Sequence, residues 1–322
     1  MYRSGLERTA VAPATIGNVG VGFDVLGLAV RGAGDTVTAT AADHGEVRIR
    51  SIEGDVPGVG EIPLDAAVNT AGIAADFTRR ASGRGEFGVD LVVRKGIPLA
   101  SGLGGSAASA AAAAFAVNQL LDSPLRTADL IAPCVEAEAA VAGRHADNVA
   151  PALLGGLVLI KELEPRVRLQ RLPIPAGLMA VVVTPRVSLA TKASRGALPE
   201  SVPLSERSRN AANLAMFVSA CYSGEAGQLA GCVEDPVVEA ARLPLIPAGP
   251  EALQAARAAG AIGASISGAG PSLFALCHAP TVAASVRDAM VGAFAAAGLE
   301  SDAVVSAADC PGASLVRAGG AS

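Results

Sequence analysis

The stretch Pro98-Leu99-Ala100-Ser101-Gly102-Leu103-Gly104-Gly105-Ser106-Ala107-Ala108-Ser109 decides how the whole chain is interpreted. The alternating run over 87–93 before it predicts a strand, and the alanine-rich run over 110–121 after it predicts a helix. Glycine lets the backbone approach a ligand closely, and the amides at the start of a helix favour an anion. The stretch therefore predicts a phosphate-binding loop, although it has neither the Walker pattern nor the dinucleotide pattern Gly-x-Gly-x-x-Gly.

Two simpler interpretations of this stretch stay open. Residues 96–121 carry no charge, and an uncharged run of that length can cross a membrane. Its Gly, Ser and Pro content, its many alanines and the polar pair Asn118 and Gln119 disfavour a membrane span. The other alternative is a glycine-rich seam at which helices pack without a ligand. Polar groups elsewhere in the chain decide between these interpretations.

The composition excludes several kinds of partner. Because 51% of the 322 residues are apolar and only 3% are aromatic, the cores must be built from alanine and aliphatic side chains. The net charge of -5 leaves no basic surface for nucleic acid. The five cysteines form no Cys-x-x-Cys pair, the N-terminus has no apolar signal core, and glycine and proline interrupt the uncharged run 259–286. We therefore predict a reduced, cytoplasmic protein without a membrane segment.

The length suits two domains, and we place their division between residues 163 and 164. The link is predicted at 162–171, a charged stretch that contains proline. Further strands are predicted at 8–14, 36–41, 46–52, 157–160, 178–184, 303–305 and 313–316. Helices are predicted at 65–81, from a Thr127 cap to near Gly143, after a Ser205 cap, and at 280–298.

A second glycine-rich loop, spanning Pro13-Ala14-Thr15-Ile16-Gly17-Asn18-Val19-Gly20-Val21-Gly22-Phe23-Asp24, follows the first of these strands. Its three glycines within six residues predict a sharp bend that carries the carboxamide of Asn18 and the carboxylate of Asp24. An ordinary turn, held by hydrogen bonds of these two side chains, is an equal alternative.

Four polar side chains gather within five residues in Arg144-His145-Ala146-Asp147-Asn148, between apolar stretches. A solvated surface does not explain this pattern, so the cluster predicts a site, whereas a lone His145 would more often be a structural hydrogen-bonding residue. Glu136 and Glu138 precede the cluster on a predicted helix, and Glu138 alone would be taken for part of a solvated face. A third glycine-rich turn spans 263–272.

In the order of these motifs the chain resembles the GHMP kinases, a family that phosphorylates small molecules. Residues 12–28, 98–109 and 263–272 resemble its three motifs, the second being the ATP-phosphate motif, and 144–156 resemble its homoserine-specific branch. The resemblance covers nearly the whole chain. It implies an α+β fold of two domains: an N-terminal ribosomal-protein-S5-like α/β domain, residues 1–163, and a C-terminal ferredoxin-like α+β domain, residues 164–322.

The resemblance also implies an activity and its residues. It implies a homodimeric enzyme that uses ATP and Mg²⁺ to phosphorylate the hydroxyl of L-homoserine, giving O-phospho-L-homoserine in threonine biosynthesis. Residues 98–108 would bind the ATP phosphates, and the metal ion would be held by Ser106 and Glu138. The substrate would be surrounded by Asn18, Asp24, His145, Arg195 and Arg242. The catalytic residues would be Asn148, Thr191 and Arg195.

The chain departs from the family pattern at two points. Many members have two serines where this chain has Gly105 and Ser106, so one hydroxyl is missing. The spacing from Glu138 to His145 is one residue shorter than is usual in the family. Either Glu138 or Glu136 therefore faces the metal ion.

The charges of these residues suit homoserine on physical grounds as well. Homoserine is a zwitterion, so its site needs an anion for the ammonium group, a task for Asp24, and forked donors for the carboxylate, a task for Arg195 or Arg242. The alternatives are a mevalonate kinase-like enzyme, which needs no ammonium partner, and a non-catalytic GHMP-fold protein that only binds a ligand. The resemblance puts Asn148 where some other GHMP kinases have an acid, so the hydroxyl proton is lost either to the phosphate itself or late in the reaction.

Overall fold

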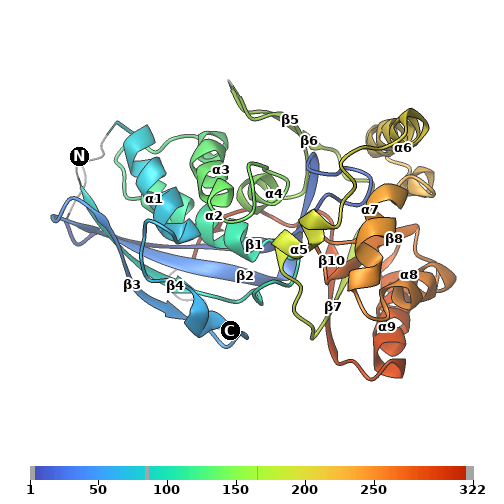
Figure 1. Ribbon diagram of the computed structural model, residues 1–322. Coiled ribbons are helices and arrows are strands. Elements are labelled where there is room, and N and C mark those ends of the chain that lie inside the picture. The colour runs from blue at the N-terminus through green and yellow to red at the C-terminus, as the bar shows by residue number, and fades with distance from the viewer. Residues whose placement is uncertain (1–3, 84–86, 165, 317–322) are drawn as a thin grey trace.

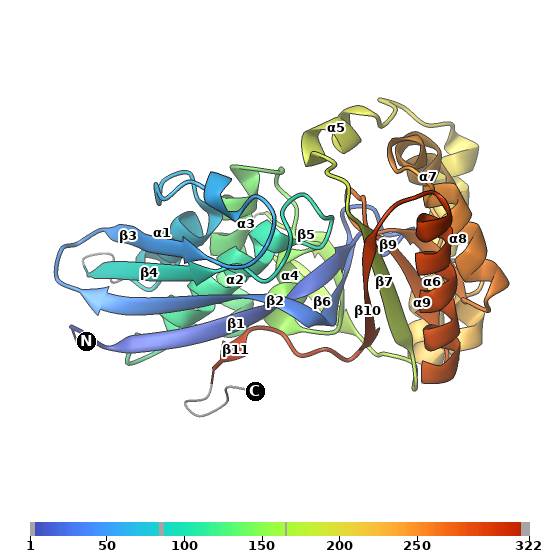
Figure 2. The ribbon, with the colours of Figure 1, turned by 90° about the horizontal axis from the view of Figure 1, so that it is seen from below.

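Two β-sheets lie side by side in the computed structural model, which describes residues 4–83, 87–164 and 166–316 (Figure 1, Figure 2). The first sheet contains β1 (Glu7–Gly17), β2 (Leu26–Ala42), β3 (Val47–Glu53), β4 (Gly88–Arg94), β5 (Leu157–Glu162), β6 (Arg168–Leu172) and β11 (Ser314–Leu315). Its order is β11-β1-β2-β4-β3, with β5 pairing with the start of β2 and β6 pairing with β5. All pairs are antiparallel except β3 with β4.

Helices cover one face of this first sheet (Figure 1). They are α1 (Thr70–Ala81), α2 (Gly105–Asn118), α3 (Ile131–Ala139) and α4 (Val149–Leu154), accompanied by the short helical turns η1 (Val59–Glu61) and η2 (Thr127–Leu130). Helix α2 is central, because it packs on β1 and β2 and also against the other three helices. Of its 14 residues, 11 are buried, as is expected of a helix that is apolar on all sides. Its alanines let the neighbouring elements approach closely.

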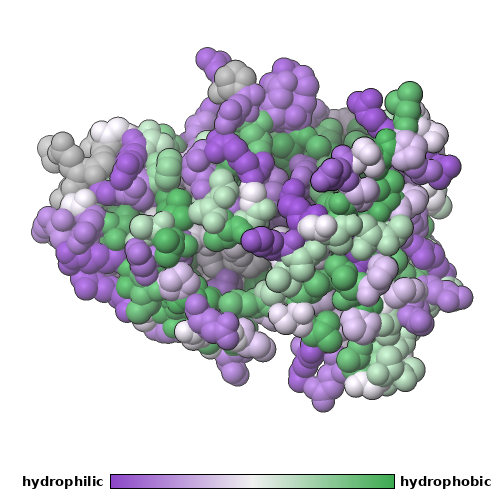
Figure 3. Space-filling model, viewed as in Figure 1, coloured by the Kyte–Doolittle hydropathy of each residue, from purple (hydrophilic) through white to green (hydrophobic). Residues whose placement is uncertain are grey.

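The uncharged run at 96–121 is thus a loop followed by a buried helix. Among the described residues, no helix is long and apolar enough to cross a membrane. On the face of the molecule shown in Figure 3, hydrophilic and hydrophobic residues are interspersed.

The second sheet contains β7 (Met179–Pro185), β8 (Gly263–Ile266), β9 (Leu273–Cys277) and β10 (Ser301–Ala307). Its order is β10-β7-β9-β8, and all its pairs are antiparallel. Helices α8 (Gly249–Ala258) and α9 (Pro280–Ala296) pack on one face. Side chains alternate along a strand. Val181 and Val183 of β7 therefore pack in the core under α8 and α9, whereas Ala180 and Val182 point the other way and belong to the core that includes the first sheet and its helices. The sheet is therefore buried on both faces.

The remaining elements of the second half are α5 (Thr191–Gly196), α6 (Leu204–Ser223), α7 (Pro236–Arg242) and the turns η3 (Ala226–Leu229) and η4 (Leu243–Leu245). Helix α5 stands apart from the second sheet, on the segment that runs on from β7 (Figure 2). The hydroxyl of Ser194 on α5 donates to the carbonyl of Ala269 at 2.6 Å, which ties this helix to the third glycine-rich turn.

The three glycine-rich segments meet where the two halves join. The amide of Gly268 donates to the carbonyl of Gly17 at 3.0 Å, and the amide of Ser272 donates to the carbonyl of Ser101 at 3.1 Å. At Gly20, whose φ is +68°, a Cβ atom would stand 1.8 Å from the carbonyl oxygen of Val233. Only glycine allows this approach, so the glycines bring chain-distant loops together.

The α+β fold class is confirmed, but several predicted boundaries are wrong. The predicted link at 162–171 is not an irregular connection, because it contains most of β6, which pairs with β5. The division of the chain after residue 163 stays a prediction. Thr127 does not cap α3; it begins the turn η2. Helix α3 ends at Ala139 rather than near Gly143, and α6 begins at Leu204 without a side-chain cap from Ser205.

Candidate active site

A cavity of about 290 Å³ opens where the three glycine-rich segments meet. It is lined by most of the residues that the sequence predicts for the site, namely Asn18, Asp24, Pro98, Leu99, Ala100, Ser101, Gly102, Gly104, Gly105, Ser106, Glu138, His145, Asn148, Thr191, Arg195 and Arg242. The other three predicted residues, Leu103, Ala107 and Ala108, pack in the core beneath the loop.

The loop before α2 has the backbone that its glycines suggest. Gly102 and Gly104 have φ values of +79° and +66°, and Ala100 also adopts a left-handed conformation at +52°. Gly104 immediately precedes α2, so the unpaired amides and the positive end of that helix lie at the cavity. A Cβ atom on Gly104 would stand 2.1 Å from Oγ1 of Thr15, so this glycine is required by packing as well as by its φ.

A buried ion pair supports this loop from below. The ammonium of Lys95 contacts the carboxylate of Asp35 and donates to the carbonyl of Gly105 at 3.0 Å and to the hydroxyl of Ser109 at 2.8 Å. Ser109 in turn donates to Asp35 at 2.6 Å. Lys95 is 7% exposed and Asp35 is fully buried, so removing either partner would leave an uncompensated charge in the core.

Glu138, rather than Glu136, lies at the cavity. Glu138 is 2% exposed, and its Oε1 has no hydrogen-bond partner among the residues that the structure describes. Burial raises the pKa of this carboxyl, while the hydroxyl of Ser106 opposes the rise. Glu136 points to the surface, where Arg144 donates to both of its oxygens at 2.7 and 3.0 Å. An orphaned buried carboxylate oxygen near a serine hydroxyl fits a hard cation such as Mg²⁺.

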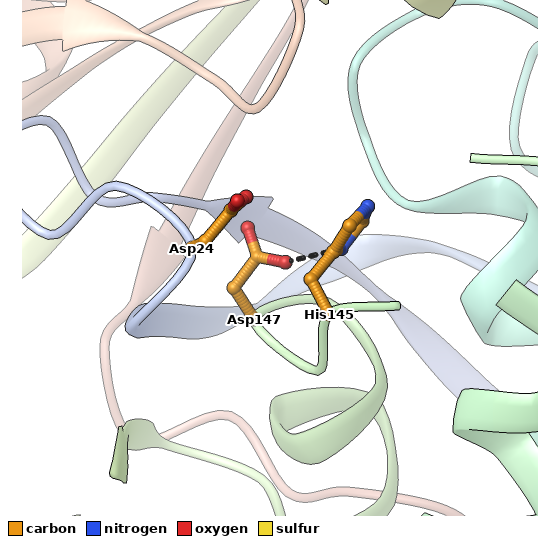
Figure 4. Close-up of side chains that lie close together, drawn as sticks. All are labelled: Asp24, His145 and Asp147. Atoms are coloured by element: carbon orange, nitrogen blue, oxygen red, sulfur yellow. Dashed lines mark hydrogen bonds and ion pairs between the residues drawn. The ribbon is translucent and has the colours of Figure 1, made fainter. Parts of the chain in front are cut away.

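Asp24, His145 and Asp147, which also line the cavity, lie close together as a cluster (Figure 4). His145 Nδ1 and Asp147 Oδ1 are 2.8 Å apart, and the buried Nε2 of His145 has no hydrogen-bond partner within the described part of the chain. Burial alone would lower the pKa of His145, but the hydrogen bond and charge of Asp147, helped by Glu138 and Asp24, raise it to about 9. His145 is therefore a cation at neutral pH.

Asn18 connects this cluster to the first glycine-rich loop. The backbone amide of Asn18 donates to Asp147 at 3.0 Å, and its side-chain oxygen accepts from the amide of Asp24 at 2.9 Å. Its side-chain nitrogen donates to the carbonyl of Gly268 at 3.1 Å. The side chain of Asn18 therefore holds this turn, and the loop also forms part of the cavity wall. Its part in substrate binding stays a prediction.

The two predicted arginines differ in their surroundings. Arg195, on α5, donates to the two oxygens of Asp24 at 3.1 and 3.4 Å, and both side chains are partly exposed. Arg242, at the end of α7, is 2% exposed and donates to the carbonyls of Ser194 at 3.2 Å and Gly268 at 2.8 Å. Within the described residues it has no carboxylate in ion-pair contact. Burial, and next the charge of Arg195, lower the pKa of Arg242.

Asn148 and Thr191 lie at different depths. The hydroxyl of Thr15 donates to Oδ1 of Asn148 at 2.8 Å, which leaves the amide nitrogen of Asn148 to donate to a ligand. Thr191 is the first residue of α5 and is exposed at the rim of the cavity.

Some residues of the site escape the sequence prediction. Asp147 belongs to the polar cluster at 144–148, and its position two residues after His145 could have indicated that it is a partner of that histidine. Lys95 follows the strand that leads into the phosphate loop, and a lysine in that place is a weak signal. Nothing in the local pattern identifies Asp35 or Thr15, because their partners are distant in the chain.

The comparisons with known proteins agree with this architecture. The model of the GHMP kinases N-terminal domain matches residues 69–156, and that of the GHMP kinases C-terminal domain matches residues 217–297. The chain is 44% identical over 311 residues to a homoserine kinase of Xanthomonas campestris pv. campestris (strain B100), covering 96% of this chain and 94% of that protein. A homoserine kinase of Chlorobaculum tepidum is 39% identical over 320 residues, and the alignment covers 96% of this chain and 98% of that protein.

The same relationship is found among solved structures. The crystal structure of homoserine kinase from Cytophaga hutchinsonii superposes with a TM-score of 0.91 at 38% sequence identity, covering 98% of this chain and 100% of that one. Both the sequence and the fold thus match over nearly their full length. The chain therefore belongs to the GHMP kinase family, within its homoserine kinase branch.

Proposed function

We propose that the protein transfers the γ-phosphoryl group of ATP to the hydroxyl of L-homoserine, giving O-phospho-L-homoserine and ADP. The observation that carries this proposal is the set of charges in one cavity: the buried guanidinium of Arg242, which lacks an ion-pair partner among the described residues, and the carboxylate of Asp24. A zwitterion suits this set because its carboxylate and ammonium groups need partners of opposite sign. The names of the relatives support the same substrate.

The phosphate loop and the first turn of α2 would hold the phosphates of ATP. The amides at the start of a helix bind anions well, and the left-handed glycines leave room for a close approach. Ser106 and Glu138 would hold Mg²⁺, which prefers oxygen ligands and keeps several waters. When bound, the ion supplies neutralisation of the charge on the phosphates.

The reaction itself asks mainly for positioning. The substrate oxygen forms a bond to the γ-phosphorus while the bond from that phosphorus to the leaving ADP oxygen breaks. Asn148 cannot take up the hydroxyl proton, because a carboxamide does not titrate and its Oδ1 accepts from Thr15. We assign the proton to a phosphoryl oxygen and give the Asn148 amide the role of a donor beside the transferred group. Thr191 and Arg195 would border the same space from α5.

Replacement of Arg242 tests the substrate site. Arg242→Ala should raise the KM for homoserine by about 10- to 1000-fold, because a charged hydrogen bond in a closed site is lost. Arg242→Lys should recover only part of the loss, since an ammonium cannot make a two-pronged contact. Steady-state kinetics with each substrate varied will measure this, and the KM for ATP should hardly move.

The matched control is Arg287→Ala, which removes a partly exposed arginine that pairs with Asp288 on α9. That variant should keep the native KM. Thermal denaturation shows whether Arg242→Ala remains folded. A folded Arg242→Ala enzyme with an unchanged KM for homoserine would place this arginine outside the substrate site.

A further inference from the structure

The ring of Phe23 lies against both arginines of the site. The guanidinium carbon of Arg195 is 5.8 Å from its centroid, and that of Arg242 is 5.4 Å away. Both separations fall within the range of about 6 Å over which a ring face attracts a cation. The three residues come from the first glycine-rich loop, from α5 and from α7, so one ring joins three separate segments.

The two guanidinium groups repel each other, and the Phe23 ring is a neighbour that attracts both. They carry the same charge, and the charge of Arg195 acts on Arg242 strongly enough to oppose its ionisation, second only to burial. Arg242 is fixed by two backbone carbonyls, but Arg195 is 41% exposed and is held by Asp24 and the ring. The negative face of the Phe23 ring reduces the repulsion between the two cations and limits where Arg195 can go.

The backbone around Phe23 is held firmly. The amides of Val25 and Leu26 both donate to the carbonyl of Gly22, at 2.9 and 2.8 Å. Asp24 has a φ of +58°, and its amide is fixed by Asn18. Phe23 is half-buried. This turn therefore presents the ring to both arginines and, from the next residue, a carboxylate to Arg195.

We propose that Phe23 is a positioning residue that orients Arg195 and Arg242 toward the carboxylate of the substrate, and so makes the enzyme prefer an amino acid to the corresponding amino alcohol. This inference rests on the proposed function. It assigns to Phe23 no contact with the reacting atoms.

The test compares two substrates, homoserine and aminopropanol, which is homoserine without its carboxylate. Phe23→Leu keeps an apolar side chain but removes the ring. We expect the KM for homoserine to rise about tenfold, whereas kcat/KM for aminopropanol and the KM for ATP stay unchanged. The preference for homoserine should therefore fall about tenfold. Phe23→Tyr, which retains an aromatic face, should restore most of that preference.

Phe77→Leu is the matched control, because Phe77 is 41% exposed on α1 and does not line the cavity. It should leave both substrates unaffected. If Phe23→Leu lowers kcat/KM equally for homoserine and aminopropanol, Phe23 has a merely structural role. If the preference for homoserine does not change, Phe23 does not position the arginines. Either result overturns the inference. A native protein that fails to phosphorylate homoserine would overturn the proposed function together with it.

Discussion

At the scale of single residues, position on a helix decides the function of similar groups. Glu136 and Glu138 are two residues apart on α3, so they point about 200° apart around the helix axis. One carboxylate pairs with Arg144 at the surface, and the other is buried at the cavity. The sequence alone left the choice between Glu136 and Glu138 open. The loop that follows α3 is irregular, so the number of residues between each glutamate and His145 does not show which carboxylate faces the cavity.

Replacement of Glu138 should separate activity from stability. Glu138→Gln should lower kcat by an amount corresponding to about 2 to 4 kcal/mol, because a metal or phosphate contact is lost. The pKa of this carboxyl is raised by burial, so its ionised form opposes folding above the ordinary pKa of the group. Glu138→Gln should therefore unfold at a higher temperature than the native protein at neutral pH.

Ser106→Ala should also lower kcat, without destabilising the fold, since a small loop side chain contributes little packing. For both Glu138→Gln and Ser106→Ala, kcat is measured by titrating the activity with Mg²⁺, and stability is measured by thermal denaturation. The control Glu136→Gln should keep native kcat. Full activity in a folded Ser106→Ala protein would remove this serine from the proposed metal site.

His145 should make stability depend on pH. Its pKa is about 9 in the folded protein and 6.5 ordinarily, so protonation stabilises the fold fully below pH 6.5 and this contribution is lost as the pH rises through about 9. The loss should amount to no more than about 3.5 kcal/mol, because a pKa difference of about 2.5 corresponds to about 1.4 kcal/mol for each pKa unit. The free energy of unfolding of native protein and of His145→Asn, measured across this range, should converge at high pH. Parallel curves would contradict the assignment.

At the scale of elements, the sequence predicts what periodicity and composition control. Strands such as β4 and β7 and helices such as α9 are found close to where their apolar patterns place them. Boundaries are less predictable. Helix α3 stops early because the amides of Val141, Ala142 and Gly143 all turn back to the carbonyl of Glu138. Strand β6 has mostly exposed side chains, and its pairing with β5 defines it rather than its pattern.

The entry to α2 offers a test at this scale. Gly104→Ala must accept a left-handed φ and a contact of 2.1 Å with Thr15, so it should destabilise the fold by about 1 to 3 kcal/mol and weaken ATP binding. Gly292→Ala on α9 is the control, because its Cβ would meet nothing within 4 Å, its φ is not positive and it lies far along the chain from the phosphate loop. Denaturation and calorimetry with ATP distinguish them. An unchanged ATP affinity in Gly104→Ala would favour the alternative interpretation of residues 98–109, in which they form a glycine-rich packing seam without a ligand.

At the scale of the whole molecule, the site exists because loops from both halves meet. The sequence identified the glycine-rich segments and most residues that line the cavity, and the family resemblance supplied their order. It did not supply the pairs between distant segments, such as Lys95 with Asp35, Thr15 with Asn148, or Phe23 with Arg242. Local periodicity carries no information on such contacts, which depend on how the two sheets are brought together.

The homodimer that the resemblance implies stays a prediction. Sedimentation equilibrium would measure it directly, and a mass of one chain at micromolar concentration would contradict it.

The most direct test of the account is a comparison of substrates. Purified protein with ATP and Mg²⁺ is offered homoserine, mevalonate or galactose, and ADP release and the phosphorylated product are both measured. We expect ADP and O-phospho-L-homoserine in equal amounts, with kcat/KM for homoserine at least about 100-fold above that for the other two, because mevalonate and galactose lack the ammonium group for which Asp24 is the proposed partner. A preference for mevalonate or galactose, or ADP release without phosphohomoserine, would contradict the central claim.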